Sequence, residues 1–274
     1  MLQGASREAS TVLDQRLEEV LDSLPDATSG WRLSDQLAEV TSLLDRELAL
    51  RRTLADPSIA GAAKARLAAD LFGKQLDGTT LDLVQACVSA RWSHPIDVVD
   101  ALESLSASAG FASAERDGVL DEVEDELFRF TRLLDREDDL YAALAAPALP
   151  AERKTEVVRA LLRGKAQDVT IAMVVRAATT RRARTLDRAL EEYLRLAAAR
   201  RARLVATVTT GARLDDGQTE RLRQTLQRLY RHDLKLQIEV DPTLVGGVVV
   251  RVGDEVIDGT IAHRVAQARR RLAG

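Results

Sequence analysis

Part of the sequence repeats itself at a constant distance of ninety residues. The run Leu43–Glu47 (LLDRE) recurs as Leu133–Glu137. The same offset, held without a gap from residue 33 to residue 91, relates Leu50 to Leu140, Leu54 to Leu144, Pro57 to Pro147, Lys64 to Lys154, Leu71 to Leu161, Thr80 to Thr170, Val84 to Val174 and Arg91 to Arg181. An offset preserved over that length predicts two copies of one module in tandem.

The repeated module has the pattern of short amphipathic helices. Apolar residues recur every three or four positions, as in Leu33, Leu37, Val40, Leu44 and Leu48, which is helical spacing. Turn residues and prolines interrupt the pattern around residues 25–30, 56–57, 77–78 and 94–95. Hydrophobic residues make up 46% of the chain and aromatic residues only 3%, so the cores must consist of Leu, Val and Ala. Five or six helices in about a hundred residues predict an antiparallel bundle.

The two copies overlap at one helix. Shifting the first helical pattern by ninety residues places it on residues 96–114, which already form the last helix of copy one. We therefore expect a first bundle over residues 1–113 and a second over residues 114–204, which share or abut this helix. Gly110 is a position where the shared segment could bend.

The composition changes after residue 204. Alternation at Val205, Thr207 and Thr209, and again from Leu234 to Val240, predicts strands with an amphipathic helix between them. Val248–Val252, the Gly253-Asp254 pair and a return strand predict a hairpin with a two-residue loop. A last helix, capped by Asp258 or Thr260, is expected to reach Leu272. The fold class is thus mainly α: two related antiparallel bundles, then an α+β module (205–274) with a three- to four-stranded sheet.

The most distinctive sequence motif in the chain is the run Asp241–Ile261 (DPTLVGGVVVRVGDEVIDGTI). It resembles the C-terminal signature of the delta subunit of F-type ATP synthases, called OSCP in mitochondria. Six residues match that signature: Gly246, Gly247, Gly253, Asp254, Asp258 and Gly259. Turns and capping explain glycine and aspartate at most of these positions. The chain is longer than the common form and is similar to a long actinobacterial type with a duplicated helical domain.

The resemblance implies a non-catalytic subunit of the peripheral stalk (stator), which links the catalytic head to the b-subunit stalk and resists rotation. It implies a bundle that holds the N-terminal helices of the alpha subunits, a helix-in-groove contact. We assign this contact to copy two, with Leu127, Phe130 and Leu134 as candidates, although core packing also explains them. It implies that the C-terminal module, with Gly246, Gly247 and Asp258, binds the C-terminal helix of the b subunit. Copy one would brace the stalk or head.

The expected location is the cytoplasmic face of the cell membrane, with contact to the membrane only through the complex. No apolar run approaches the roughly 20 residues that span a bilayer, and Met1–Ser10 has no signal-peptide core. The alternative function is a helical-repeat adaptor that binds partner helices in another complex.

Catalytic, cofactor and metal sites are not expected. The three histidines, His94, His232 and His263, are not at metal-ligand spacing to one another or to Cys87, the single cysteine. No glycine-rich run leads into Lys-Ser or Lys-Thr, so a nucleotide phosphate loop is not expected. A net charge of −4 and the absence of aromatic stacking residues in the C-terminal strands argue against nucleic acid as a partner.

Overall fold

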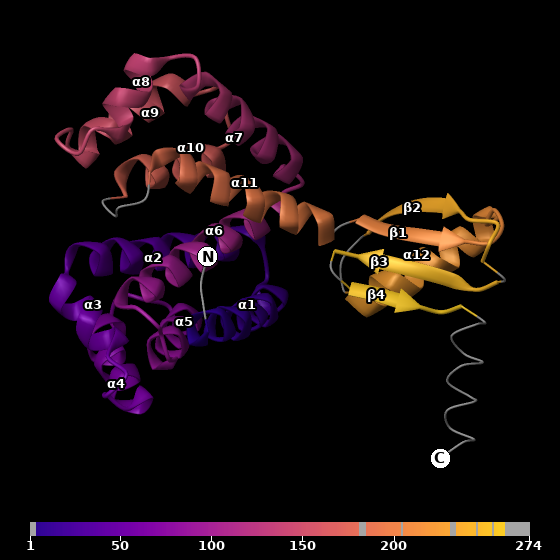
Figure 1. Cartoon of the computed structure of the whole chain (residues 1–274), viewed down its shortest axis with the longest axis horizontal. Helices are drawn as coiled ribbons and strands as arrows, with labels where there is room; N and C mark the ends of the chain where they lie inside the picture. The colour runs from indigo at the N-terminus through magenta and orange to yellow at the C-terminus, as the bar shows by residue number, and fades with distance from the viewer. Residues whose placement is uncertain are drawn as a thin grey trace. The chain divides into compact units, whose positions relative to one another are not determined.

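The computed structural model describes residues 4–180, 185–203, 205–230, 234–244, 246–253 and 255–260. The chain divides into two compact units, Met1–Ala197 and Ala198–Gly274. The first unit is helical and the second contains the sheet, as the ribbon in Figure 1 shows. The fold is therefore mainly α with a small C-terminal α+β module, which confirms the predicted fold class.

Six helices build the first copy. They are α1 (Ala5–Ser23), α2 (Ala27–Arg46), α3 (Leu48–Ala55), α4 (Gly61–Phe72), α5 (Gly78–Ser89) and α6 (Pro95–Arg116). One apolar core joins them, and Leu17, Leu37, Leu83 and Leu102 are among its fully buried members. The core contains few aromatic side chains and many leucines, valines and alanines, in agreement with the composition.

The second copy reproduces the helix order of the first from α2 onward, and three of its helices have the same boundaries. Its helices are α7 (Leu120–Leu134), α8 (Asp138–Ala145), α9 (Ala151–Leu162), α10 (Asp168–Thr179) and α11 (Leu186–Arg203). Helices α8, α9 and α10 begin and end ninety residues after α3, α4 and α5. The duplication that the sequence predicts is therefore present in the secondary structure.

A polar contact at the start of one helix is also duplicated. In copy one the Gln36 side-chain oxygen accepts from the backbone N–H of Asp77 (3.2 Å) and the hydroxyl of Thr80 (2.6 Å), at the start of α5. At the same offset, Glu126 accepts from the N–H of Gln167 (2.9 Å) and the hydroxyl of Thr170 (2.6 Å), at the start of α10. Each contact satisfies an N–H that the first turn of a helix leaves unpaired. Lys64 and Lys154 are also equivalent, and their ammonium groups both donate to a backbone carbonyl, but the two acceptors, Ala90 and Ala178, are not at equivalent positions.

Helix α6 packs against both copies. It contacts α1, α2, α3 and α5 on one side and α7 and α10 on the other. Most of its 22 residues are buried, including polar Glu103, Ser106 and Ser113. A helix apolar or small on every face, as here, is typical of burial on all sides. Gly110 does not end the helix. A Cβ there would lie 2.6 Å from Cε of Met173, the flexible end of a side chain from α10 that occupies this space.

In its described residues, the second unit is a four-stranded sheet covered by one helix. Its elements are β1 (Val205–Thr210), α12 (Asp216–Tyr230), β2 (Lys235–Val240), β3 (Val248–Val252) and β4 (Glu255–Asp258). The strand order is β2-β1-β3-β4, with β1 and β2 parallel and the other pairs antiparallel. Leu226 of α12 packs with Ala206, Val208 and Val250 of the sheet.

The predicted hairpin is confirmed. Val252 pairs with Glu255, so two residues connect β3 to β4, and Gly253 has a φ of 56°. Such a φ is easily adopted only by glycine. The predicted final helix to Leu272 lies outside the described residues.

Candidate functional site

The three candidate residues of copy two lie on the inner face of α7. Leu127, Phe130 and Leu134 are all buried, together with Val123 one turn earlier. The outward apolar side chain of this helix is Phe128, which is 53% exposed. The sequence pattern identified the buried stripe and missed Phe128. Phe128 could have been noticed in the sequence, because it lies outside the buried apolar stripe of α7 and the chain has few aromatic residues.

The candidate residues of the C-terminal signature lie where the segment before β3 approaches the end of β4. Gly246 and Gly247 have φ values of 116° and 87°. A Cβ on Gly247 would lie 2.5 Å from the carbonyl oxygen of Gly259, so this close backbone approach requires glycine. The carboxylate of Asp258 accepts from the N–H of Thr260 at 2.9 Å. These residues give the backbone its path after β4, and they belong to a different unit from Leu127, Phe130 and Leu134.

Apolar side chains remain exposed on this module. Leu229 of α12, Val240 at the end of β2 and Val256 of β4 are each about half exposed or more. Strands β2 and β4 are the two edges of the sheet. Edge strands carry unpaired backbone groups, so these are places where a partner segment could add.

Cys87 and the three histidines are the side chains to consider for chemistry. Cys87 is fully buried, and burial raises the pKa of its thiol well above the usual range. The backbone N–H of His94 donates to the carboxylate of Asp97 at the start of α6. His232 and His263 lie outside the described residues. Across the described ranges no group of His, Cys, Asp and Glu is arranged to hold a metal ion. No helix in the described part of the chain is long and apolar enough to cross a bilayer.

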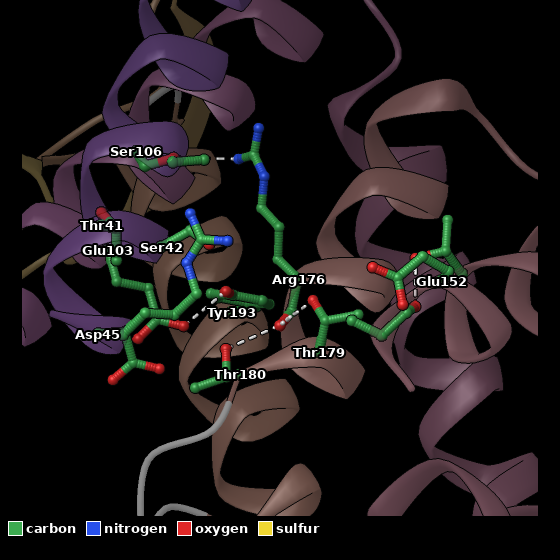
Figure 2. Close-up of a pocket in the computed structure, with 14 residues that line it drawn as sticks. Thr41, Ser42, Asp45, Glu103, Ser106, Glu152, Arg176, Thr179, Thr180 and Tyr193 are labelled. Carbon is green, nitrogen blue, oxygen red and sulfur yellow. Dashed lines mark hydrogen bonds between the residues drawn. The ribbon is translucent and has the colours of Figure 1, made fainter. Parts of the chain in front are cut away.

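Arg176 of α10 connects the second copy to the first. Its guanidinium donates to the hydroxyls of Ser34 (2.9 Å) and Ser106 (3.1 Å) and to the carboxylate of Asp35 (2.7 Å). It also lies 5.4 Å from the ring centroid of Trp31, within cation–π range. Figure 2 shows the side chain extending from α10 toward Ser106. One residue of copy two thus binds both α2 and α6.

A pocket of about 510 Å³ lies beside this contact. Its walls come from α2 and α6 of the first copy and from α9, α10 and α11 of the second, with Thr180 just past the end of α10. Figure 2 shows the hydroxyl of Tyr193 pointing to the carboxylate of Glu103, which it meets at 2.7 Å. The pocket is therefore a feature of the pair of copies, which neither copy forms alone.

Comparison with known proteins identifies the family. The family model described as ATP synthase delta (OSCP) subunit matches residues 102–272. The chain is 47% identical to the ATP synthase subunit delta of Streptomyces griseus, over all of both chains. It is 49% identical to that of Streptomyces avermitilis over 98% of both. The chain belongs to the ATP synthase delta (OSCP) subunit family. The predicted resemblance to this family is confirmed. The full-length matches also confirm the similarity to the long actinobacterial type.

This delta-family chain is a non-catalytic subunit of the peripheral stalk of an F-type ATP synthase. The stator interpretation is therefore confirmed over the adaptor alternative. The family match begins inside α6 and runs through copy two into the C-terminal module, leaving most of copy one outside. The subunit delta of Frankia alni, 44% identical over 99% of both chains, is as long as this one. A chain of the Toxoplasma gondii mitochondrial ATP synthase hexamer is a weaker structural match, with a TM-score of 0.35 and 18% identity, over 61% of this chain and 95% of that chain.

Proposed function

We propose that copy two holds the N-terminal helices of the alpha subunits, and that the C-terminal module binds the C-terminal helix of the b subunit. The observation that carries this proposal is the extent of the family match. Residues 102–272 contain most of helix α6, copy two and nearly all of the module as one continuous block. The contacts common to the family should reside in the part that the family model covers.

The contact on copy two is proposed to run along the outer face of α7. Phe128 offers an exposed apolar side chain there, and apolar anchors in the centre of an interface carry most of its binding energy. The buried residues of α7 contribute indirectly to this contact, because they pack α7 onto the core of its copy. These residues are Leu127, Phe130 and Leu134.

The contact on the C-terminal module is proposed to use the sheet edges. Val240 and Val256 are exposed on the two edge strands. Gly246, Gly247 and Asp258 shape the backbone at the end of β4. Their proposed contribution to binding is to hold this edge strand in place. Two separate contacts on one chain raise the effective concentration of the second, which suits a subunit under torque.

Copy one is proposed to brace the peripheral stalk or the head. It occupies the first hundred residues, which the family model leaves largely unmatched. In this arrangement the chain reaches the cytoplasmic face of the cell membrane only through its partners.

The assignment of the copies is tested by point substitution in the full chain. Deletion of copy one is a poor test, because it would expose the face of α6 that packs on α2. The informative variant is Phe128→Ser on α7, and its matched control is Leu48→Ser on α3 of copy one, where Leu48 is 51% exposed. Binding of a peptide with the sequence of the alpha-subunit N-terminus is measured by calorimetry.

We expect Phe128→Ser to weaken peptide binding about tenfold, the effect of losing an apolar anchor worth ~1.4 kcal/mol. Leu48→Ser should bind as the parent does. The opposite pattern, a loss with Leu48→Ser alone, would assign the peptide to copy one.

A further inference from the structure

Strand β2 is the longer of the two edge strands of the sheet. It has six residues, against four in β4 at the other edge, and its six consecutive pairs with β1 contain no bulge. No proline interrupts it. Very short strands, bulges and prolines are among the features by which proteins keep a further strand from pairing with an edge. The edge formed by β2 has none of these three.

The ladder with β1 determines which backbone groups of β2 face outward. The N–H of Asp241 donates to the carbonyl of Thr210 at 2.8 Å, so the odd-numbered residues of β2 direct their N–H and C=O groups toward β1. Leu236, Ile238 and Val240 direct theirs away from the sheet. Among the described residues, no backbone group bonds these three on that side. Their N–H and C=O groups are thus arrayed along the edge for another strand.

An apolar face runs along the same edge. Because side chains alternate along a strand, Leu236, Ile238 and Val240 all point to the face that α12 covers. Leu236 and Ile238 are partly buried against the core of the module, and Val240 is 49% exposed. A neighbouring strand could therefore extend this apolar face.

Helix α12 contributes an exposed leucine above this edge. Leu226 faces the sheet, and the helical period places Leu229 and Tyr230 on opposite flanks of it. Tyr230 lies on the flank toward β4, because its hydroxyl donates to Glu255 at 2.9 Å. Leu229 therefore lies on the flank toward β2, and it is 60% exposed. A strand added to β2 would bury part of Leu229.

The other face of β2 is polar and offers a negative charge. Lys235, Gln237 and Glu239 lie on it and are exposed. The carboxylate of Glu239 accepts from the side chain of Gln237 at 3.5 Å, and within the described ranges it has no ion pair. Lys235 already has an interaction partner. A basic side chain is therefore the complement of this face.

We propose that β2 binds an extended segment of a partner protein as a fifth strand of the sheet. The segment carries apolar side chains at alternate positions, which continue the apolar face, and a basic side chain beside Glu239. Backbone hydrogen bonds to the edge supply affinity, and the alternate side chains supply specificity. The inference goes beyond the proposed contacts with helices of the alpha and b subunits and does not rest on them.

A probe peptide of about eight residues, within the usual length of a strand, tests the inference on the full chain. In this peptide valine alternates with lysine and threonine, and both ends are capped. Calorimetry gives the Kd, and amide chemical shifts should change at Leu236, Ile238 and Val240. No binding at about 1 mM, the Kd of a weak contact, or shifts confined to β4, would overturn the proposal.

Two N-methylated forms of the peptide distinguish strand pairing from apolar contact. One is methylated on the valine amides and the other on the lysine and threonine amides, so their side chains are the same. Successive N–H groups of a strand point to opposite edges, so only one form keeps the donors that face β2. We expect that form to bind about tenfold more tightly. Equal affinity of the two forms would refute pairing through the backbone.

Substitutions on β2 locate the contact. Val240→Pro removes an N–H that faces away from β1, so it breaks no bond of the ladder and should weaken peptide binding about tenfold. Val240→Thr keeps this N–H and a β-branched side chain, so it is the matched control and should bind as the parent does. Glu239→Gln should weaken binding about threefold. A peptide with threonine in place of lysine should not distinguish Glu239→Gln from the parent.

Thermal melts of each variant separate loss of binding from loss of fold. If Val240→Pro does not fold, Glu239→Gln and the two methylated peptides still decide the matter. A second copy of the chain is the competing occupant of this edge, and sedimentation of the parent tests it. A dimer that dissociates in Val240→Pro, together with no binding of the peptide, would assign the edge to a second copy and overturn the proposal.

Discussion

Replacing Arg176 with alanine should loosen the attachment of copy two to copy one. The guanidinium makes two hydrogen bonds to serine hydroxyls and one ion pair with Asp35, and its side chain is 16% exposed. Copy one has Ala86 at the equivalent position, so this contact is not part of the repeated core.

The magnitude follows from what each partner keeps after the substitution. The hydroxyls of Ser34 and Ser106 still donate to each other's backbone carbonyls, at 2.7 Å each, so no buried hydroxyl loses its acceptor. Asp35 is half exposed and regains water, so its ion pair contributes only ~0.5–1 kcal/mol. Two hydrogen bonds from a charged donor add ~1 kcal/mol each after the exchange with water. The expected loss is therefore about 2.5–3 kcal/mol.

Calorimetry and hydrogen exchange measure this loss. A helical unit of this size should melt about 5–10 °C lower, and amides of α10 should exchange faster than those of α4 and α5. Arg153→Ala is the control, because Arg153 lies on the exposed face of α9 in an ion pair with Glu156, and it should cost less than ~0.5 kcal/mol. Equal effects of the two substitutions would refute the view that Arg176 fastens the copies together.

Three further predictions concern other parts of the first unit. Gly30→Ala should raise the free energy of unfolding by ~0.5–1 kcal/mol in a chemical denaturation curve. The reason is that Gly30 is helical and a new Cβ would meet Ser113 at an ordinary 3.7 Å, so a destabilised variant would contradict this prediction. Hydrogen bonds from Ser29 lower the pKa of Asp26 below its ordinary 3.8, so its N-cap contribution is present above that pH and lost as the pH falls through the lower folded-state value. The difference in melting temperature between parent and Asp26→Ala should accordingly shrink in acid, and a difference independent of pH would count against the cap. Cys87 should not react with a thiol reagent until the bundle unfolds, because the thiol is buried and its pKa is raised; rapid labelling of the native chain would show that α5 opens locally.

Local signals in the sequence determine most of the secondary structure. Apolar positions and one proline (Pro57 and Pro147) recur in both copies at the same offset, and α3, α4 and α5 have the same bounds as their counterparts α8, α9 and α10. The alternation of Val248–Val252 and the glycine at 253 likewise specify the β3–β4 hairpin. The domain boundaries at 113 and 204 and the individual partner-binding residues remain predictions.

Only the tertiary structure decides which faces and partners these elements choose. The alternation of apolar residues along a strand predicts that one face is buried. It does not predict that β1 lies between β2 and β3, because strand order depends on contacts distant in sequence. The stripe of α7 predicts an apolar face, and only packing shows that Leu127, Phe130 and Leu134 fill the core while Phe128 faces outward. The ninety-residue repeat predicts two like modules, whereas the single helix α6 between them, the Arg176 contact and the pocket beside it depend on side chains that differ between the copies. A repeat encodes what its copies share, and the junction between them is built from what they do not share.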